Sequence, residues 1–198
     1  IHTGGVDNMF PHHEDEIAQS EAVTGKKWVN YWLHCEHLMV DNTKMSKSLG
    51  NFYTLRDLLA KGYTGREVRW VLIGTHYRKK LNFSLTALDQ ARETLGKFSS
   101  FFARMKEITA AGDGSEAAAV AEQSENQFRT AIADDLNSAG ATAALFTLVR
   151  EGNRLADAGT LSAAGAAKLL ECCRDFDRVF GCLDVDAAPA AEEFPAEV

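Results

Sequence analysis

Features typical of membrane and secreted proteins are missing from this sequence of 198 residues. No apolar run approaches the roughly 20 residues that a membrane span requires, and no secretory signal is present. We therefore expect a cytoplasmic protein with no membrane partner. An initial methionine is also missing, since the sequence begins with Ile1, and we expect the chain to be a part of a longer protein.

Cysteines are few and do not form a metal-binding or redox pattern. The four are Cys35, the neighbours Cys172 and Cys173, and Cys182, and none forms a Cys-x-x-Cys pair. Adjacent cysteines rarely bridge each other, so the pattern favours a reducing compartment without structural disulfides.

Positive charge is scarce overall but concentrated in one region. The net charge of −7 argues against general coating of nucleic acid. The range 26–80 nevertheless has eleven Lys or Arg against four Asp or Glu, and the last fifteen residues have no basic residue. A local basic surface in an acidic protein fits a discrete polyanion site.

The first part of the chain, residues 1–53, has the pattern of an α/β fold. "IHTGGVDNMF" is typical of a strand end and loop, and Pro11 suits the first turn of a helix that runs to about Thr24. "YWLHCEHLMV" has the aromatic and β-branched character of one strand.

Everything from Thr54 onward has helical patterning. Thr54 and Thr64 are candidate N-caps in a helical connector over 54–83, and Ser84 can cap a long helix to about Ile108. Three further helices are expected at 116–134, 137–158 and 161–180. The whole range 84–182 then forms an antiparallel bundle, and 183–198 is a disordered tail. The expected fold class is α/β followed by all-α.

The segment "DNTKMSKSLGN", residues 41–51, carries two lysines in a small, polar loop. Lys44 and Lys47 can place two ammonium groups around an anion, and Ser46 and Ser48 add hydroxyl donors. Mobile cations that close on a departing pyrophosphate stabilise a transition state preferentially. The alternative from these residues alone is an exposed, solvated loop.

Two further motifs stand near the beginning of the chain. In "HTGGVD", Gly4 and Gly5 could let a nucleotide lie against the backbone, with Asp7 accepting hydrogen bonds from ribose hydroxyls. The alternative is a tight loop whose glycines only supply a positive φ. His2 is either a core histidine or a wall of an active site.

In "FPHHEDEIAQ", His12 and Glu16 are four residues apart and share one face of a helix. An imidazole nitrogen and a carboxylate oxygen can be two ligands of Zn²⁺. The alternative is an acidic first turn with two solvated histidines, since no further ligand is evident and nothing ties Cys35 to the pair.

These motifs together resemble the cysteinyl-tRNA synthetase family of class I aminoacyl-tRNA synthetases. "KMSKS" follows a predicted strand about 30 residues after "GGVDNMFPHHEDE". "KMSKSLGNFYTLRDLL", "HYRKKLNFS" and "DDLNSAGATAALFTLVREGN" extend the similarity over residues 1 to about 160. Departures from the family pattern occur at Thr3 and at Ser138-Ala139, away from the proposed chemistry.

The resemblance implies a fold and a set of roles. The chain would be the C-terminal half of a Rossmann-like catalytic domain plus most of a bundle of the anticodon-side, DALR-like type. Lys47 and its partner Lys44 would be the catalytic pair of the ATP loop. Gly4, Gly5 and Asp7 would contact nucleotide, and His2 would lie at the edge of the amino-acid pocket.

The resemblance also implies a metal and partners. One zinc ion would be held by His12, Glu16 and two cysteines upstream of Ile1, and it would select the cysteine thiolate. ATP with Mg²⁺, L-cysteine and tRNA(Cys) would be the substrates of a monomeric enzyme. Arg78, Lys79 and Lys80 could contact tRNA phosphate, although a solvated basic surface is an equal alternative.

Two rival functions stay open. A cysteine ligase of mycothiol synthesis shares the zinc and the lysine loop but has less need of the long helical bundle. A non-catalytic module that binds RNA or protein is the second alternative, although such a remnant has no evident use for the lysine loop.

Overall fold

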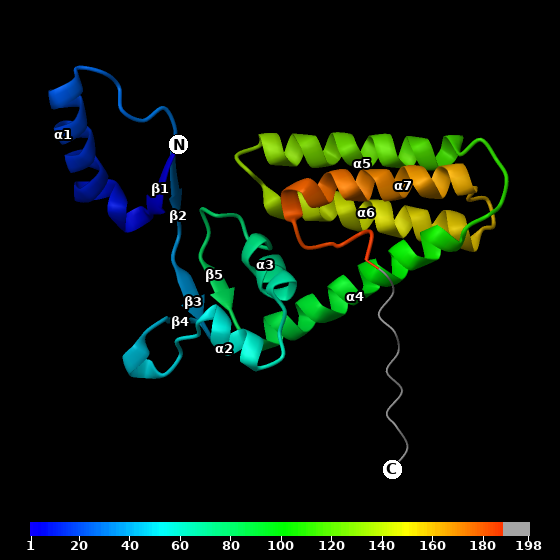
Figure 1. The fold of residues 1–198 in the computed structure, drawn as a ribbon, viewed down its shortest axis with the longest axis horizontal. Helices are drawn as coiled ribbons and strands as arrows, with labels where there is room; N and C mark the ends of the chain where they lie inside the picture. Colours follow the sequence, from blue (N-terminus) through cyan, green and yellow to red (C-terminus); the bar gives the residue numbers. More distant parts are fainter. Residues whose placement is uncertain (188–198) are drawn as a thin grey trace, which may run out of the picture.

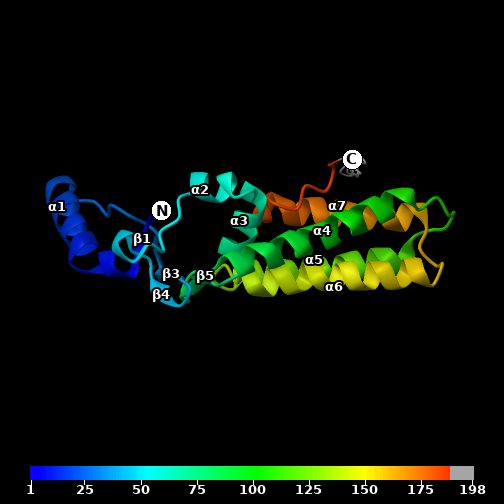
Figure 2. The same ribbon diagram turned by 90° about the horizontal axis from the view of Figure 1, so that it is seen from below.

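The computed structural model describes residues 1–187 of the chain. The molecule is elongated: small α/β units lie at one end and a bundle of long helices at the other (Figures 1 and 2). This arrangement confirms the expected order of an α/β part followed by an all-α part.

The first unit is a strand, a helix and a parallel strand. Strand β1 (His2–Gly5) pairs with β2 (Trp32–Cys35) in the register His2 to Trp32. Between them lie the short turns η1 (Val6–Asn8) and η2 (Met9–His13) and helix α1 (Glu14–Thr24). The three acidic residues that begin α1 favour its N-terminal dipole. Pro11 lies in η2 directly after the extended Phe10, and the backbone N–H of Glu14 bonds to its carbonyl, so the predicted first turn at Pro11 leads into α1.

The predicted single strand over "YWLHCEHLMV" is wrong, since the structure divides it into two strands in different sheets. β2 ends at Cys35, and β3 (Leu38–Val40) pairs antiparallel with β4 (Thr43–Lys44) and parallel with β5 (Leu81–Phe83). The strand β5 lies in the range predicted as a helical connector, and its partner β3 is about forty residues earlier in the chain.

The connector contains two short helices whose starts follow the predicted capping pattern. Thr54 caps α2 (Leu55–Ala60) in a reciprocal bond with Asp57. Thr64 caps α3 (Gly65–Ile73) in the same way with Glu67. Both helices pack over the three-stranded sheet in a small core that includes buried side chains of β3, β5 and the next helix: Val40, Leu58, Val71, Phe83, Leu88 and Ala91.

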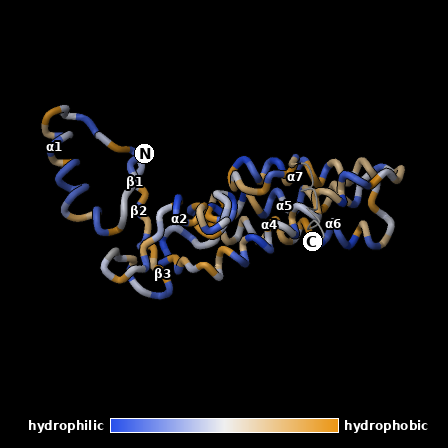
Figure 3. The backbone as a smooth tube through the Cα atoms, turned by 60° about the horizontal axis from the view of Figure 1, so that its bottom comes forward, coloured by the Kyte–Doolittle hydropathy of each residue, from blue (hydrophilic) through white to orange (hydrophobic). Residues whose placement is uncertain are grey.

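Four long helices form the bundle and confirm the helical pattern predicted for this region. They are α4 (Leu85–Glu107), α5 (Ser115–Ala133), α6 (Ser138–Asp157) and α7 (Ala163–Phe180). Buried apolar side chains from all four helices form one core, and Figure 3 shows apolar and polar residues alternating along these helices. Phe128 stacks on Phe176 with ring centroids 4.1 Å apart, which ties α5 to α7.

The predicted disordered tail begins too early at residue 183. Leu183 and Val185 are buried against the bundle. The carboxylate of Asp177 accepts hydrogen bonds from the backbone N–H groups of Cys182 and Leu183, both at 2.8 Å. These contacts hold the segment through residue 187, and the rest of the predicted tail, 188–198, lies outside the described residues. Within the described part of the chain, the structure contains no helix with the length and apolar character of a membrane span.

Candidate active site

The lysine loop follows β4 and is closed by one side chain. The Oδ1 atom of Asn51 accepts the backbone N–H of Ser46 at 2.8 Å. Its Nδ2 group donates to Thr43 Oγ1 at 2.9 Å and to the carbonyl of Lys44 at 3.2 Å. Asn51 therefore joins the two ends of the loop, and sequence reasoning missed it, although its place directly after Gly50 in "SLGN" is a turn signal.

Within the loop, two of the predicted anion-binding side chains lie close to each other. Lys44 is exposed at the end of β4 and belongs to no ion pair among residues 1–187. The hydroxyl groups of Ser46 and Ser48 are 2.7 Å apart. The backbone of Lys47 begins the short helical turn η3 (Lys47–Leu49). The loop therefore presents a cation and two hydroxyl groups at the edge of the three-stranded sheet.

The two glycines of "HTGGVD" lie in β1, and their φ angles are not positive, so the alternative based on a positive φ is wrong. A Cβ atom on Gly4 would be 2.8 Å from Cε1 of His13. A Cβ atom on Gly5 would be 2.4 Å from Oδ1 of Asp7. The glycines are needed because an imidazole and a carboxylate pack directly against the strand.

Beside β1, the carboxylate of Glu16 lies between two histidines. Its Oε2 atom is 3.0 Å from Nε2 of His2, and its Oε1 atom is 3.7 Å from Nε2 of His12. The predicted pair of His12 and Glu16 therefore does share one face of α1, and the structure adds His2 to it. His12 is the most open member, with 63% of its side chain exposed.

A second histidine pair lies behind the first and is shielded by aromatic rings. His13 is buried, and its Nδ1 atom is 2.8 Å from Nε2 of His34 on β2. The ring of Trp32 lies 5.0 Å from that of His13 and is stacked on that of His34. Burial, helped by the neighbouring histidines, lowers the pKa of His13 and favours its neutral form. The sequence does not distinguish His13 from its neighbour His12. In the structure the two side chains lie on different sides of the turn, where His13 is buried and His12 is exposed.

The donor set around Glu16 fits a metal of the zinc type. Ligand atoms of His2, His13 and Glu16 all lie within 4.8 Å of one another. The Oε2 atom of Glu16 is buried and lies 3.0 Å from Nε2 of His2, which is a hydrogen-bonding distance. Imidazole nitrogens and a carboxylate oxygen are ordinary zinc ligands. Cys35 is exposed on β2 and is not a member of this group.

Of the three basic residues 78–80, only Arg78 has a described ion-pair partner. It donates from Nε to Asp135 at 2.6 Å and to the hydroxyl of Tyr77 at 2.9 Å. Lys79 and Lys80 are exposed. The other three cysteines are buried, and burial raises the pKa of Cys172 to about 12 and that of Cys182 to about 11.

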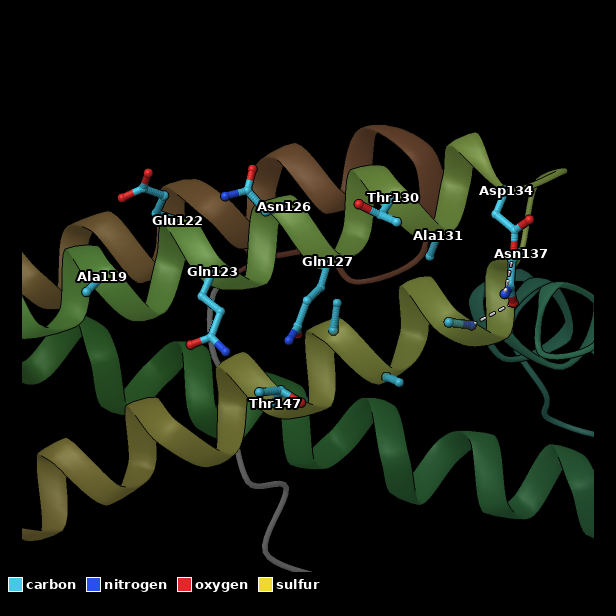
Figure 4. Close-up of a pocket in the computed structure, with 13 residues that line it drawn as sticks. Ala119, Glu122, Gln123, Asn126, Gln127, Thr130, Ala131, Asp134, Asn137 and Thr147 are labelled. Carbon is cyan, nitrogen blue, oxygen red and sulfur yellow. Dashed lines mark hydrogen bonds between the residues drawn. The ribbon is translucent and has the colours of Figure 1, made fainter.

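An open groove of about 1150 Å³ runs between α5 and α6 (Figure 4). Small residues such as Ala131 and Gly140 line it, together with side-chain amides such as Gln123 and Gln127. Its lining contains no basic residue, so the groove is not itself a phosphate site.

Two family models match this chain. Residues 1–93 match the catalytic domain of class I tRNA synthetases (C), and residues 127–184 match the DALR domain. The first match contains the lysine loop and the histidine cluster, and the second covers the end of α5 and all of α6 and α7.

The chain is similar to curated cysteine–tRNA ligases. The one from Protochlamydia amoebophila is 47% identical over 186 residues, which are 94% of this chain and 39% of that protein. The one from Chlamydia pneumoniae is 45% identical over 195 residues, 98% of this chain and 41% of that protein. The chain thus spans about two fifths of the length of these relatives.

A solved structure shares the fold at low sequence identity. It is the ternary complex of Agrobacterium radiobacter K84 AgnB2 LeuRS with tRNA and LeuAMS, with a TM-score of 0.64 and 16% identity. The similarity covers 92% of this chain and 28% of that one. The α/β part and the bundle therefore have the arrangement of a class I synthetase.

Proposed function

The chain belongs to the cysteine–tRNA ligase family of class I aminoacyl-tRNA synthetases, and we propose that the protein containing it activates L-cysteine with ATP and transfers it to tRNA(Cys). The observation that carries this proposal is the lysine loop closed by Asn51, directly after β4. A surface loop that is tied at its ends can close on the phosphates of ATP and open to release pyrophosphate.

In the first step, a carboxylate oxygen of cysteine attacks the α-phosphorus of ATP, and the bond to the pyrophosphate oxygen breaks. Negative charge grows on the departing pyrophosphate. Lys47 and Lys44 stabilise that charge, and the hydroxyl groups of Ser46 and Ser48 donate to phosphate oxygens. Mg²⁺ accompanies the ATP as part of the substrate.

Nucleotide and amino acid are held by the first α/β unit. Asp7 accepts hydrogen bonds from the ribose hydroxyls, and Gly4 and Gly5 contact the nucleotide through their backbone groups. His2 lies at the edge of the amino-acid pocket, where its contact with Glu16 orients that carboxylate. In the second step, a hydroxyl of the terminal ribose of tRNA attacks the cysteinyl carbonyl, and AMP departs.

His12 and Glu16 would hold a zinc ion together with two cysteines outside this chain. When bound, zinc binds the cysteine thiolate, a soft ligand that serine cannot replace. Shape alone discriminates weakly between cysteine and serine, by about 1–3 kcal/mol for a comparable change. The imidazole nitrogens gathered around the Glu16 carboxylate support a metal at this position.

The long bundle favours the synthetase over an amino-sugar ligase or a non-catalytic module, because residues 127–184 match a DALR domain. We further propose that the protein works as a monomer in the cytoplasm.

The test is ATP–pyrophosphate exchange by the complete protein, followed by charging of tRNA(Cys). We expect exchange that depends on cysteine and is negligible with serine. Exchange with another amino acid, or charging of another tRNA at equal efficiency, would reject the proposal.

A further inference from the structure

The turn between α5 and α6 contains two residues with a left-handed backbone, and one of them, Asp135, carries a carboxylate. Asp135 has φ 51° and Leu136 has φ 58°, both in the left-handed region that residues other than glycine rarely occupy. Such conformations persist where the surrounding structure stabilises them. Here the turn directs the Asp135 carboxylate away from the bundle and toward the connector.

Two connector residues bind this carboxylate, one on each oxygen. The hydroxyl of Tyr77 donates to Oδ1 at 2.5 Å, and Nε of Arg78 donates to Oδ2 at 2.6 Å. The ring of His76 stacks on that of Tyr77 with centroids 4.8 Å apart. These hydrogen bonds hold the pKa of Asp135 low and keep it charged.

The same connector residues lie next to the sheet that carries the lysine loop. The carbonyl of Tyr77 accepts the backbone N–H of Glu36 at 2.8 Å, directly before β3. Three residues after Arg78, β5 begins and pairs with β3, which in turn pairs with β4 and Lys44. A continuous set of contacts therefore leads from the α5–α6 turn to the loop.

We propose that Asp135 is a positioning residue that sets the orientation of the bundle relative to the lysine-loop sheet during transfer to tRNA. The inference rests on the proposed function, because it assumes that the bundle supports tRNA. Helix α5 has 19 residues. At 1.5 Å per residue it is about 28 Å long, so a rotation of about 10° at the turn moves its far end by about 5 Å.

Stability alone is a weak reason for this contact. The Asp135 side chain is 46% exposed, and ion pairs at the surface contribute little to the free energy of folding. Arg66 and Arg69 of α3 provide a separate attachment, since they donate to main-chain carbonyls at the end of α7. Removal of the Asp135 carboxylate therefore leaves the bundle folded and attached through α3, but without the contact that fixes the α5–α6 turn against the connector.

The test compares Asp135→Asn and Tyr77→Phe with Asp157→Asn in the complete protein. Asp157 is the matched control, because it also binds an arginine at 2.6 Å, but Arg104 lies in the same bundle. Cysteine-dependent pyrophosphate exchange should be unchanged in all three. The kcat/KM for tRNA charging should fall by on the order of 10- to 100-fold in the first two, since displacement by about 1 Å has effects of that size.

A double variant of Asp135 and Tyr77 should charge tRNA no worse than Asp135→Asn alone, because both changes remove the same contact. Unchanged charging, an equal fall in exchange and charging, or the same fall in Asp157→Asn would overturn the inference. A wild-type protein without exchange would instead reject the proposed function, and the inference with it.

Discussion

The side chain of Asn51 accepts the backbone N–H of Ser46 at 2.8 Å and so joins the two ends of the lysine loop. The loop is therefore a closed unit whose base is fixed by one side chain. Its reactivity should depend on Asn51 as well as on the lysines.

Substitution Asn51→Ala should slow pyrophosphate exchange by on the order of 10- to 100-fold, because the cations lose their alignment with the phosphates. The melting temperature should stay the same, since the loop lies at the surface. Asn153→Ala is the control: it removes an asparagine that accepts a hydrogen bond from Arg104 in the bundle. Equal exchange rates for Asn51→Ala and Asn153→Ala would show that Asn51 does not align the cations with the phosphates.

Substitution His12→Ala should lower the zinc content of the complete protein and its preference for cysteine over serine together. Metal analysis and exchange with each amino acid measure the two quantities. His76→Ala is the control, because this histidine lies in the connector, beside Asp135. Full zinc content in His12→Ala would exclude His12 as a ligand and would direct attention to His2 and His13.

Two helical glycines of the bundle should respond to alanine in opposite directions. A Cβ atom on Gly152 would be 2.9 Å from the ring of Phe101, whereas one on Gly96 would meet nothing within 4 Å. We expect Gly152→Ala to lower the free energy of unfolding by about 1–3 kcal/mol through overpacking. Gly96→Ala should raise it by about 0.5–1 kcal/mol. Chemical denaturation measures both, and a stabilising Gly152→Ala would contradict the packing described for α6.

Lowering the pH should destabilise the folded connector, because it protonates the carboxylate of Glu67. Burial raises the pKa of this carboxyl, but hydrogen bonds from Arg92 and the backbone of Thr64 outweigh that effect and leave the pKa lowered. A carboxyl with a lowered folded pKa contributes its stabilisation fully above its unfolded pKa, about 4.3. That contribution is lost as the pH falls through the folded pKa.

Glu67→Gln should therefore flatten the decline in stability below about pH 4. Glu93→Gln replaces an exposed carboxylate on α4 and should leave the decline as it is. Thermal unfolding measured across pH distinguishes the two, and parallel curves for Glu67→Gln and wild type would disprove the role of Glu67.

Local patterns predicted the helices well because their causes are local. Thr64 and Glu67 are three residues apart, and their reciprocal bonds need no other part of the chain. By contrast, β5 depends on pairing with β3, about forty residues away, and the role of Asp135 depends on Tyr77, 58 residues away. The prediction of a tail from residue 183 fails because Asp177, six residues earlier, accepts a hydrogen bond from the backbone of Leu183. Such tertiary contacts leave no periodic signal in the sequence.

The most direct test of the central claim is cysteine-dependent pyrophosphate exchange by Lys47→Ala in the complete protein, with the zinc content measured on the same sample. Lys97→Ala, on the exposed side of α4, is the control. We predict that exchange falls by orders of magnitude in Lys47→Ala while zinc content and folding stay at wild-type values. Exchange at the wild-type rate, or loss of zinc with the activity, would contradict this prediction.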